Sequence, residues 1–225
     1  EETYTTTAGA KVTIPLLAEN ERVGLRRELG LGTGLVLLGS STWPGEETVL
    51  LTALKTARER GLKVSLLLVP RHAERREELR GLLEKSGLSF HFRSTGAAAG
   101  TVDVAVGDTT GELRKFTQLA DLVFTGKSLA PHDGGQTPVE AAVLGKPVLH
   151  GPRMTNFRDI IRTLTEAGAV RKAETHSELI AVAVELLQDA AQREKLATAA
   201  REWSEANRGA TERTLAVIRT QLAAR

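Results

Sequence analysis

Short apolar runs alternate with amphipathic segments along most of this chain. The runs 35–39 ("LVLLG") and 63–70 ("KVSLLLVP") are apolar almost throughout, as in strands that are buried on both faces of a sheet. Between them, 46–60 carries apolar residues at helical spacing and is followed by glycine. The same patterns predict further strands at 88–92, 102–106, 121–124 and 147–149, and further helices at 18–31, 73–85, 111–119, 138–144 and 157–167.

The order of these elements predicts the fold class. Strands that alternate with helices form βαβ units, and such units build a parallel sheet with helices on both faces. From residue 177 onward the sequence is nearly all helical, rich in Ala, Leu, Glu and Arg. We therefore predict an α/β fold, a doubly wound, Rossmann-like parallel sheet with a C-terminal helical tail. The Thr-rich segment 1–12 is predicted to be a linker and 13–225 a single domain.

Composition and charge narrow the function classes. The 225 residues carry a formal net charge of +2, with 41% hydrophobic and 26% charged residues, as in ordinary soluble domains. Basic and acidic residues alternate, as in "RHAERREELRGLLEK", so the pI near 9.1 does not indicate a nucleic-acid partner. The absence of cysteine excludes disulfides and thiolate metal sites. Neither a membrane span nor a signal-peptide core is predicted, which is typical of a cytosolic-type domain.

Two loops resemble phosphate-binding motifs but lack the required context. "GLGTG" (30–34) precedes its strand, whereas the dinucleotide fingerprint needs a strand, then glycines, then a helix. "GKS" (126–128) ends like a Walker A loop, but Asp121 stands where that motif needs a glycine. The histidines show no paired ligand spacing, so a zinc site has little support.

Four loops follow the carboxyl ends of predicted strands, where open α/β sheets bind their ligands. They read "GSSTWPGEE" (39–47), "PRH" (70–72), "GDTTGEL" (107–113) and "TGKSLAPHDGGQTPVE" (125–140). Because the strands are predicted to be parallel, these loops should converge on one edge of the sheet. We predict the ligand site there.

The last of these loops has the features of a nucleotide site. Gly134 and Gly135 lack side chains, so their backbone N–H groups can approach an anion closely. Pro138 suits the first helical turn, which places Thr137 at or near the N-cap. Glu140 at the helix start can accept hydrogen bonds from a ribose diol. Alternatively, Glu140 complements the helix dipole while Thr137 caps the helix.

This loop, followed by Ala-Ala-x-x-Gly-x-Pro-Val, resembles the donor-nucleotide signature of GT-B glycosyltransferases. The closer resemblance is to the 3-deoxy-D-manno-octulosonic acid (Kdo) transferases, which move Kdo from CMP-Kdo onto a lipid A precursor. The blocks that carry it, over roughly residues 10–220, are "STWPGEE" (41–47), "LLLVPRHAER" (66–75), "VGDTTGELRKFTQLADLVFTGKSL" (106–129) and "PHDGGQTPVEAAVLGKPVLHGPRMTNFRDI" (131–160). Two positions depart from the family pattern: Trp43 replaces a histidine, and Gln136-Thr137 stand around the usual asparagine.

The resemblance implies how a whole enzyme would be organised. A GT-B enzyme has two Rossmann-like domains, and this chain resembles the second, which binds the donor. The catalytic carboxylate and the membrane-facing acceptor site would belong to an N-terminal domain, so no catalytic residue is predicted here and the isolated chain is expected to be inactive. The resemblance implies no metal or other cofactor, CMP-Kdo as donor substrate, and a cytoplasmic enzyme peripheral to the inner membrane.

Several residues are candidates for donor contacts. Arg71, next to Pro70 at a strand end, is predicted to contact CMP or the Kdo carboxylate, or else to pair with Glu74 or Glu77 on the surface. Lys127 is predicted to neutralise the phosphate, or else to be a solvated loop lysine. The complete set of predicted binding residues is Ser41, Pro70, Arg71, Thr110, Gly111, Lys127, Gly134, Gly135, Gln136, Thr137 and Glu140.

For the helix-start residues, structural alternatives stay open. Thr110 and Gly111 can offer backbone N–H groups, or the segment is simply capped by Asp108 or Thr109 with Glu112. Ser41 can contact the donor or cap the following helix.

Two other functions remain open at this point. One is a GT-B protein that uses a UDP-sugar, either a transferase or an epimerase, which would prefer uridine to cytidine. The other is a noncatalytic nucleotide-binding or interaction module with the helical tail as its interface. The tail's apolar residues Leu215, Val217 and Ile218 are predicted to be partly exposed.

Overall fold

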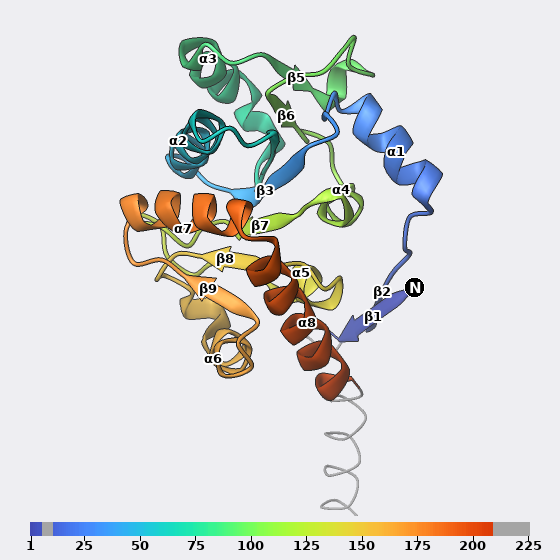
Figure 1. Cartoon of the computed structure of the whole chain (residues 1–225), viewed down its shortest axis with the longest axis vertical. Coiled ribbons are helices and arrows are strands. Elements are labelled where there is room, and N and C mark those ends of the chain that lie inside the picture. Colours follow the sequence, from blue (N-terminus) through green and yellow to red (C-terminus); the bar gives the residue numbers. More distant parts are fainter. Residues whose placement is uncertain (6–10, 209–225) are drawn as a thin grey trace, which may run out of the picture.

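The predicted parallel sheet is present. The computed structural model describes residues 1–5 and 11–208, and within them seven parallel strands form one sheet in the order β5-β6-β4-β3-β7-β8-β9 (Figure 1). Six match predicted strands, and the seventh, β9, was not predicted. The strands are β3 (Leu35–Thr42), β4 (Val64–Pro70), β5 (Phe90–Phe92), β6 (Val104–Val106), β7 (Leu122–Thr125), β8 (Val148–His150) and β9 (Val170–Lys172).

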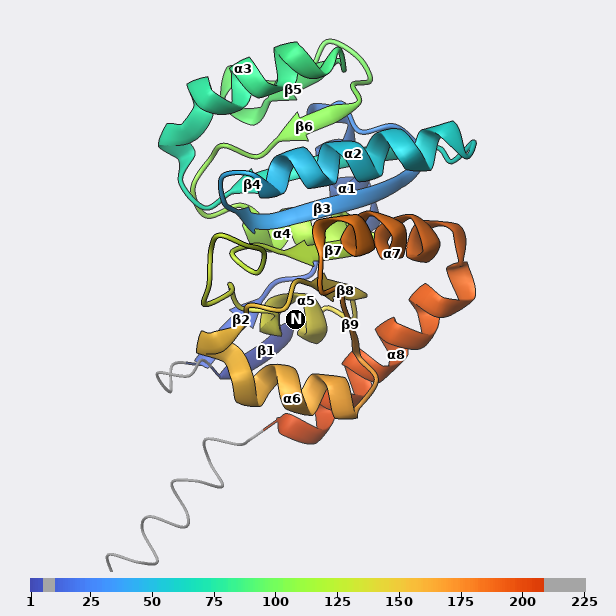
Figure 2. The same ribbon diagram turned by 90° about the vertical axis from the view of Figure 1, so that its left-hand side faces the viewer.

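Helices cover both faces of this sheet. One face packs against α2 (Glu46–Glu59), α3 (Arg76–Ser86) and α7 (His176–Gln188), and α2 and α7 lie in front of the sheet in Figure 2. The opposite face packs against α1 (Glu19–Glu28), α4 (Leu113–Leu119), α5 (Val139–Val143) and α6 (Arg158–Glu166), and α8 (Ala190–Asn207) lies against α5. Short 3₁₀ turns occupy Ala73–Arg75, Arg93–Thr95 and Thr155–Phe157.

The two layers of core follow from the alternation of side chains along each strand. On β3, Leu37 points to the α2 and α7 side, whereas Val36 and Leu38 point to the α1 and α4 side, and all three are fully buried. Positions 36–38 of this central strand are therefore apolar on both faces, which is the pattern that predicted the fold.

The chain ends differ from the simple picture of a linker and a tail. Residues Glu2–Thr5 (β1) and Lys11–Ile14 (β2) pair as an antiparallel two-stranded sheet. The proposed boundary between 1–12 and 13–225 stays a prediction. The helical tail is confirmed as α7 and α8 through Asn207, while Leu215, Val217 and Ile218 lie outside the described residues.

Two helices, α3 and α4, begin more than one residue later than predicted. α4 begins at Leu113 rather than 111, because Gly111 has φ +85°, outside the helical range. α3 begins at Arg76, after the 3₁₀ turn at Ala73–Arg75.

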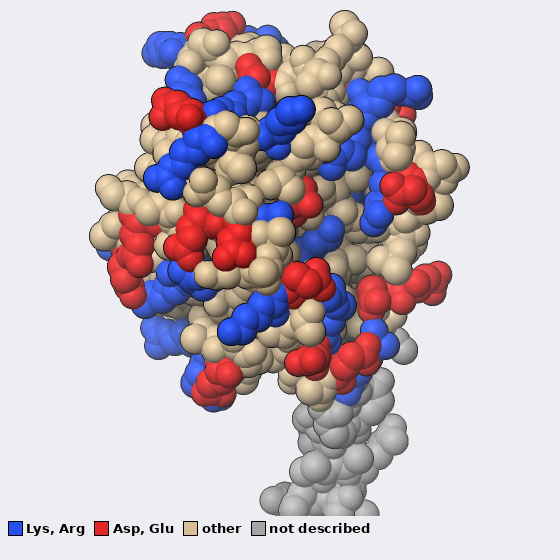
Figure 3. Space-filling view, viewed as in Figure 1, with Lys and Arg blue, Asp and Glu red and all other residues tan. Residues whose placement is uncertain are grey.

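The surface agrees with the mixed charge pattern of the sequence. Basic and acidic side chains are interspersed over the face shown in Figure 3. Among the described residues, no helix is long and apolar enough to cross a bilayer.

Candidate functional site

The strand order places a topological switch point between β3 and β7. From β3 the chain continues to β4 on one side, while β7 lies on the other side of β3. The loops that follow the carboxyl ends of β3 and β7 therefore lead in opposite directions and leave space for a ligand between them. In Figure 2 the loop after β7 lies at the left-hand edge of the sheet. The four predicted loops therefore share one edge, here called the carboxyl rim, as the sequence indicated.

A buried glutamate joins the two central loops. Glu46, the first residue of α2, is 2% exposed. Its carboxylate accepts hydrogen bonds from the backbone N–H groups of Lys127 (2.9 Å), Ser128 (2.9 Å) and Leu129 (3.2 Å) after β7, and from that of Trp43 (2.9 Å) after β3. Burial raises the pKa of Glu46, and these four N–H groups oppose that shift. One side chain thus fixes both loops of the switch point.

The same two loops contain unusual backbone. Ser41 (φ +53°) and Lys127 (φ +57°) are the non-glycine residues with positive φ in the described chain. Such conformations cost about 1–3 kcal/mol each and cluster at functional sites. Gly126 lies between these residues in space, since its N–H donates to the Ser40 carbonyl (2.9 Å) and a Cβ would stand 2.3 Å from the Ser41 carbonyl oxygen. The strain therefore lies where the two loops touch.

An aromatic and cationic cluster forms over the rim. The Nζ of Lys127 lies 4.7 Å from the ring centre of Trp43, a cation–π distance. His72 and His132 contact the same indole, with ring centres 5.3 Å and 5.2 Å away. Lys127 has no carboxylate partner among the described residues, so its positive charge is available at the switch point. The indole Nε1 of Trp43 is buried and has no hydrogen-bond partner among the residues that the structure describes.

The paired glycines serve the loop's own fold, which corrects the sequence prediction. The N–H of Gly134 donates to Asp133 Oδ1 (2.7 Å) and that of Gly135 to the Lys127 carbonyl (3.0 Å), so neither offers a donor to an anion. Their φ values are +108° and +70°, and a Cβ on Gly135 would stand 2.3 Å from Met154 Sδ. The loop therefore needs glycine for its turns and close packing.

The residue after the glycines continues this internal pairing. The N–H of Gln136 donates to the Gly126 carbonyl (3.0 Å), which leaves the half-buried side chain as the group that Gln136 can offer a ligand. Thr137 lies near the helix start as predicted: Pro138 is the N-cap, and Thr137 Oγ1 accepts from the N–H of Val139 (3.3 Å).

Glu140 has a partner that neither sequence interpretation included. Its Oε1 accepts from Nε of Arg114 on α4 (3.0 Å), and its side chain is 14% exposed. α5 has only five residues, so its dipole is a weak reason for the carboxylate. The Glu140 carboxylate can therefore either hold Arg114 in place or bind a ligand, and both roles need its charge.

The remaining candidates differ in exposure. Arg71 is exposed and its side chain has no partner among the described residues, because Glu74 lies near His72 (3.4 Å) and Glu77 near Arg80 (3.8 Å). The alternative of surface pairing for Arg71 is therefore wrong. Pro70 ends β4 opposite Thr42 of β3.

Thr110 and Gly111 are exposed on the rim before α4, whereas Asp108 is buried. Asp108 does not cap α4 as one alternative had it: its carboxylate accepts from Arg76 Nε (2.6 Å) and from Ser94 N (2.9 Å) and Oγ (2.6 Å). It therefore ties the loop after β6 to α3. Thr109 does contact Glu112, to which its hydroxyl donates a hydrogen bond.

The buried His150 at the end of β8 should make the stability of the fold depend on pH. Its Nδ1 lies 2.7 Å from the Gly151 carbonyl, its Nε2 is buried without a partner among the described residues, and burial lowers its pKa below 6.5. The unfolded chain thus takes up this proton first as the pH falls, so stability should drop between pH 6.5 and the lower folded-state pKa. Urea unfolding at several pH values should show this slope in the wild type and a shallower one in His150→Phe.

The matched control for this effect is His176→Gln, because His176 is exposed. It should keep the wild-type slope. An unchanged slope in His150→Phe would assign the acid sensitivity to other groups.

Comparisons with known proteins bear on the family. No protein-family model matches the chain. It is 35% identical over 217 residues to the 3-deoxy-D-manno-octulosonic acid transferase of Bordetella pertussis, a match that covers 94% of this chain and 50% of that protein. The enzyme of the same name from Haemophilus influenzae is 34% identical over 189 residues, covering 83% and 44%. The chain thus spans about half the length of the curated relatives it matches.

A solved structure covers the same part of the family. The C-terminal CMP-Kdo binding domain of WaaA from Acinetobacter baumannii superposes with a TM-score of 0.74 and 28% identity, covering 82% of this chain and 96% of that domain. This chain belongs to the Kdo transferase family. Its GT-B-like fold corresponds to the C-terminal domain of a Kdo transferase.

The Kdo transferase blocks also contain buried residues that sequence reasoning did not single out. In "STWPGEE", Glu46 holds the two rim loops, and Glu47 accepts from Arg75 Nη1 (2.7 Å) with 1% of its side chain exposed. The signal was present as two consecutive acids after Pro-Gly, but acids in a first helical turn are usually solvated. Metal clusters of three or more His, Cys, Asp or Glu are absent from the described residues.

Proposed function

We propose that this chain is the donor-binding half of an enzyme that transfers Kdo from CMP-Kdo to a lipid A precursor in lipopolysaccharide synthesis. The observation that supports this most is the match in fold and sequence to a CMP-Kdo binding domain, joined to a switch point with an unpaired lysine. In the whole protein, an N-terminal domain would supply the catalytic carboxylate and the acceptor site. The enzyme would work on the cytoplasmic side of the inner membrane, with no cofactor beyond the donor.

The reaction would displace CMP from the anomeric carbon of Kdo. As the bond from that carbon to the phosphate oxygen breaks, negative charge develops on the leaving phosphate, and fixed positive groups stabilise it. We assign this to Lys127, which lies over Trp43 at the switch point, and to the exposed guanidinium of Arg71. Ser41, Thr110, Gly111 and the Gln136 amide would add hydrogen bonds along the same rim.

Gly134 and Gly135 have an indirect role in this proposal. Because their N–H groups are used within the loop, they shape the path between Gly126 and α5 rather than bind the phosphate. Thr137 and Pro138 precede α5, and in this proposal Glu140, the second residue of that helix, would bind the ribose hydroxyls.

Titration calorimetry with CMP and UMP tests the proposal against its alternatives. We expect CMP to bind and UMP to bind at least about five-fold more weakly, roughly the effect of one lost hydrogen bond. Tighter binding of UMP would favour a UDP-sugar enzyme instead. Binding of neither nucleotide would favour a noncatalytic interaction module. Kdo transfer by this chain alone would contradict the assignment of catalysis to a further domain.

The substitution Glu140→Gln is expected to weaken CMP binding about ten-fold or more. A charge-assisted hydrogen bond contributes about 1.5–3 kcal/mol, and ~1.4 kcal/mol is ten-fold in affinity. 2′-Deoxy-CMP should bind the wild type more weakly than CMP and lose less on mutation. Calorimetry with both nucleotides measures the two effects.

Arg114→Gln is the matched control, because it breaks the same ion pair from the other side and keeps the carboxylate. If Glu140 binds ribose, Arg114→Gln should leave CMP affinity within about two-fold, because the Glu140 carboxylate that contacts the ribose is kept. Equal losses in both variants, or for both nucleotides, would return Glu140 to a structural role.

A further inference from the structure

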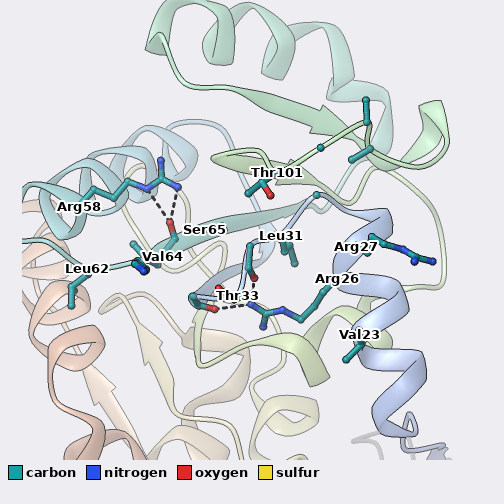
Figure 4. Close-up of a pocket in the computed structure, with 17 residues that line it drawn as sticks. Val23, Arg26, Arg27, Leu31, Thr33, Arg58, Leu62, Val64, Ser65 and Thr101 are labelled. Carbon is teal, nitrogen blue, oxygen red and sulfur yellow. Dashed lines mark hydrogen bonds between the residues drawn. The ribbon is translucent and has the colours of Figure 1, made fainter.

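An open cavity of about 950 Å³ lies at the edge of the sheet opposite the carboxyl rim. Its walls come from α1, the loop 30–34 before β3, the start of β4 and the loop 98–101 before β6 (Figure 4). Small-molecule sites have volumes of roughly 300–1,000 Å³, so this cavity has room for a ligand. It is formed by "GLGTG" and by part of "STGAAAGT", two loops for which the proposed donor site has no use.

The charges of the lining are all of one sign. Arg26, Arg27, Arg58 and Lys63 line the cavity, and no Asp or Glu does. Arg58 is neutralised by Asp103, but the other three have no carboxylate partner among the described residues. Over the face shown in Figure 3 basic and acidic side chains are interspersed, so this lining is a local excess of positive charge. An anion would find there the charge that the protein itself leaves uncompensated.

The position of one arginine is fixed before any ligand arrives. Arg26 reaches from α1 to the loop 30–34, where its Nη2 donates to the carbonyls of Gly32 (2.5 Å) and Gly34 (2.6 Å). Figure 4 shows Arg26 and Arg58 approaching the cavity floor from opposite sides, whereas Arg27 extends away from it. In the part of the chain described, Nε and Nη1 of Arg26 have no acceptor, so the guanidinium holds the loop and keeps donors to spare.

The two loops are also locked to each other. The N–H of Val102 donates to the Gly30 carbonyl (2.8 Å), and a Cβ on Gly30 would stand 2.7 Å from the Gly100 carbonyl oxygen. A Cβ on Gly34 would stand 2.1 Å from the Lys63 carbonyl oxygen. These contacts require glycine at both positions, so the cavity is preformed, which lowers the ordering cost of binding.

Apolar groups stand beside the charges. Val23 on α1 is 58% exposed, the highest exposed fraction of any large hydrophobic residue in the described chain, and Leu62 lies across the cavity. A ligand that fills the site therefore needs an apolar part as well as an acidic group.

We propose that this cavity binds an anionic organic molecule, with its phosphate, sulfonate or carboxylate group against Arg26 and Lys63 and its apolar part against Val23 and Leu62. The site is separate from the donor site, because it lies at the amino-terminal ends of β3 and β4 rather than at their carboxyl ends. Both sites can be filled at once.

The test uses 8-anilino-1-naphthalenesulfonate as probe, with fluorescence for affinity and ¹⁵N NMR for location. N-phenyl-1-naphthylamine, which has the same rings without the sulfonate, measures the need for charge. Gly32→Phe fills the cavity, since a Cβ on Gly32 has only Thr101 Cγ2 as neighbour, at 3.4 Å. Lys63→Glu reverses one exposed charge, and Lys195→Glu is the control on exposed α8 surface.

We expect one saturable site, with amide shifts at 30–34 and 98–101. Gly32→Phe should weaken binding of the sulfonate probe at least ten-fold. Lys63→Glu should weaken it about five-fold, which is roughly the effect of one close charge pair in water. Lys195→Glu should leave the affinity unchanged, and the uncharged amine should bind at least about five-fold more weakly. Equal affinity for the amine, an unchanged affinity in Gly32→Phe, or shifts spread over other surfaces would overturn the proposal. If Gly32→Phe does not fold, Lys63→Glu and the uncharged probe decide.

Vesicles distinguish the two sources of such an anion. Sedimentation with phosphatidylglycerol vesicles but not with phosphatidylcholine vesicles, reduced in Lys63→Glu, would assign the anion to a lipid headgroup. Binding of the sulfonate without sedimentation would assign it to a free molecule. If Lys63→Glu sediments with phosphatidylglycerol vesicles as the wild type does, this cavity does not bind the lipid headgroup, and the proposed lipid source is contradicted.

Discussion

Replacement of Gly126 by alanine is expected to destabilise the protein by about 3 kcal/mol or more. A Cβ at this position would stand 2.3 Å from the Ser41 carbonyl oxygen and 2.9 Å from that of Ser40, and both are backbone atoms of a fully packed central strand region. The loops after β3 and β7 would have to move apart, which breaks the hydrogen bond that the Gly126 N–H donates to the Ser40 carbonyl. Urea unfolding measures the loss of stability, and calorimetry on the folded fraction should show CMP binding weakened at least ten-fold.

Gly81→Ala is the matched control for this variant. Gly81 lies inside α3, and a Cβ there meets no atom within 4 Å. The same change should stabilise the protein by about 0.5–1 kcal/mol, because alanine is the better helix former. A Gly126→Ala protein as stable as the wild type would show that the two loops are not in the contact described.

Glu46→Ala is expected to destabilise the protein by about 2–4 kcal/mol. The substitution leaves the N–H groups of Ser128 and Leu129 buried without an acceptor, and each such group costs about 1–3 kcal/mol. The N–H groups of Trp43 and Lys127 are partly buried and can turn to water, and the loss of a buried carboxylate offsets part of the cost.

The loops that Glu46 holds should also lose order. Amide hydrogen exchange of 127–129 should therefore speed up in Glu46→Ala at a denaturant concentration where the protein stays folded. Glu59→Ala is the control on the same helix, where the residue is exposed, and should change stability by no more than about 0.5 kcal/mol. Unchanged exchange at 127–129 would mean that the carboxylate does not hold these loops.

The fold could be predicted from sequence because its central strands are apolar on both faces. β9 was missed because only Val170 of its three residues is buried, and Lys172 is exposed at the edge of the sheet. An edge strand with so few buried positions shows no alternation of apolar and polar residues from which a strand could be predicted.

The place of the site was predictable, but the roles of its residues were less so. Gly134 and Gly135 were predicted to offer N–H groups to an anion, but whether glycine serves a ligand or a neighbour depends on Met154 and Asn156, which are distant in sequence. Glu46 looked like an ordinary first-turn acid because the Lys127, Ser128 and Leu129 N–H groups that donate to its carboxylate lie more than 80 residues away, after β7. Partners brought together by the sheet leave no local pattern.

The central claim is that a cytidine nucleotide binds at the carboxyl rim, and an NMR titration of the ¹⁵N-labelled chain with CMP tests it most directly. We expect saturable shifts in the amides of the non-proline residues of 41–45 and 126–137 and at Glu140, on the loops that flank the switch point between β3 and β7. Saturable CMP shifts confined to the opposite edge, at 30–34 and 98–101, or no saturable shifts at all, would contradict the account.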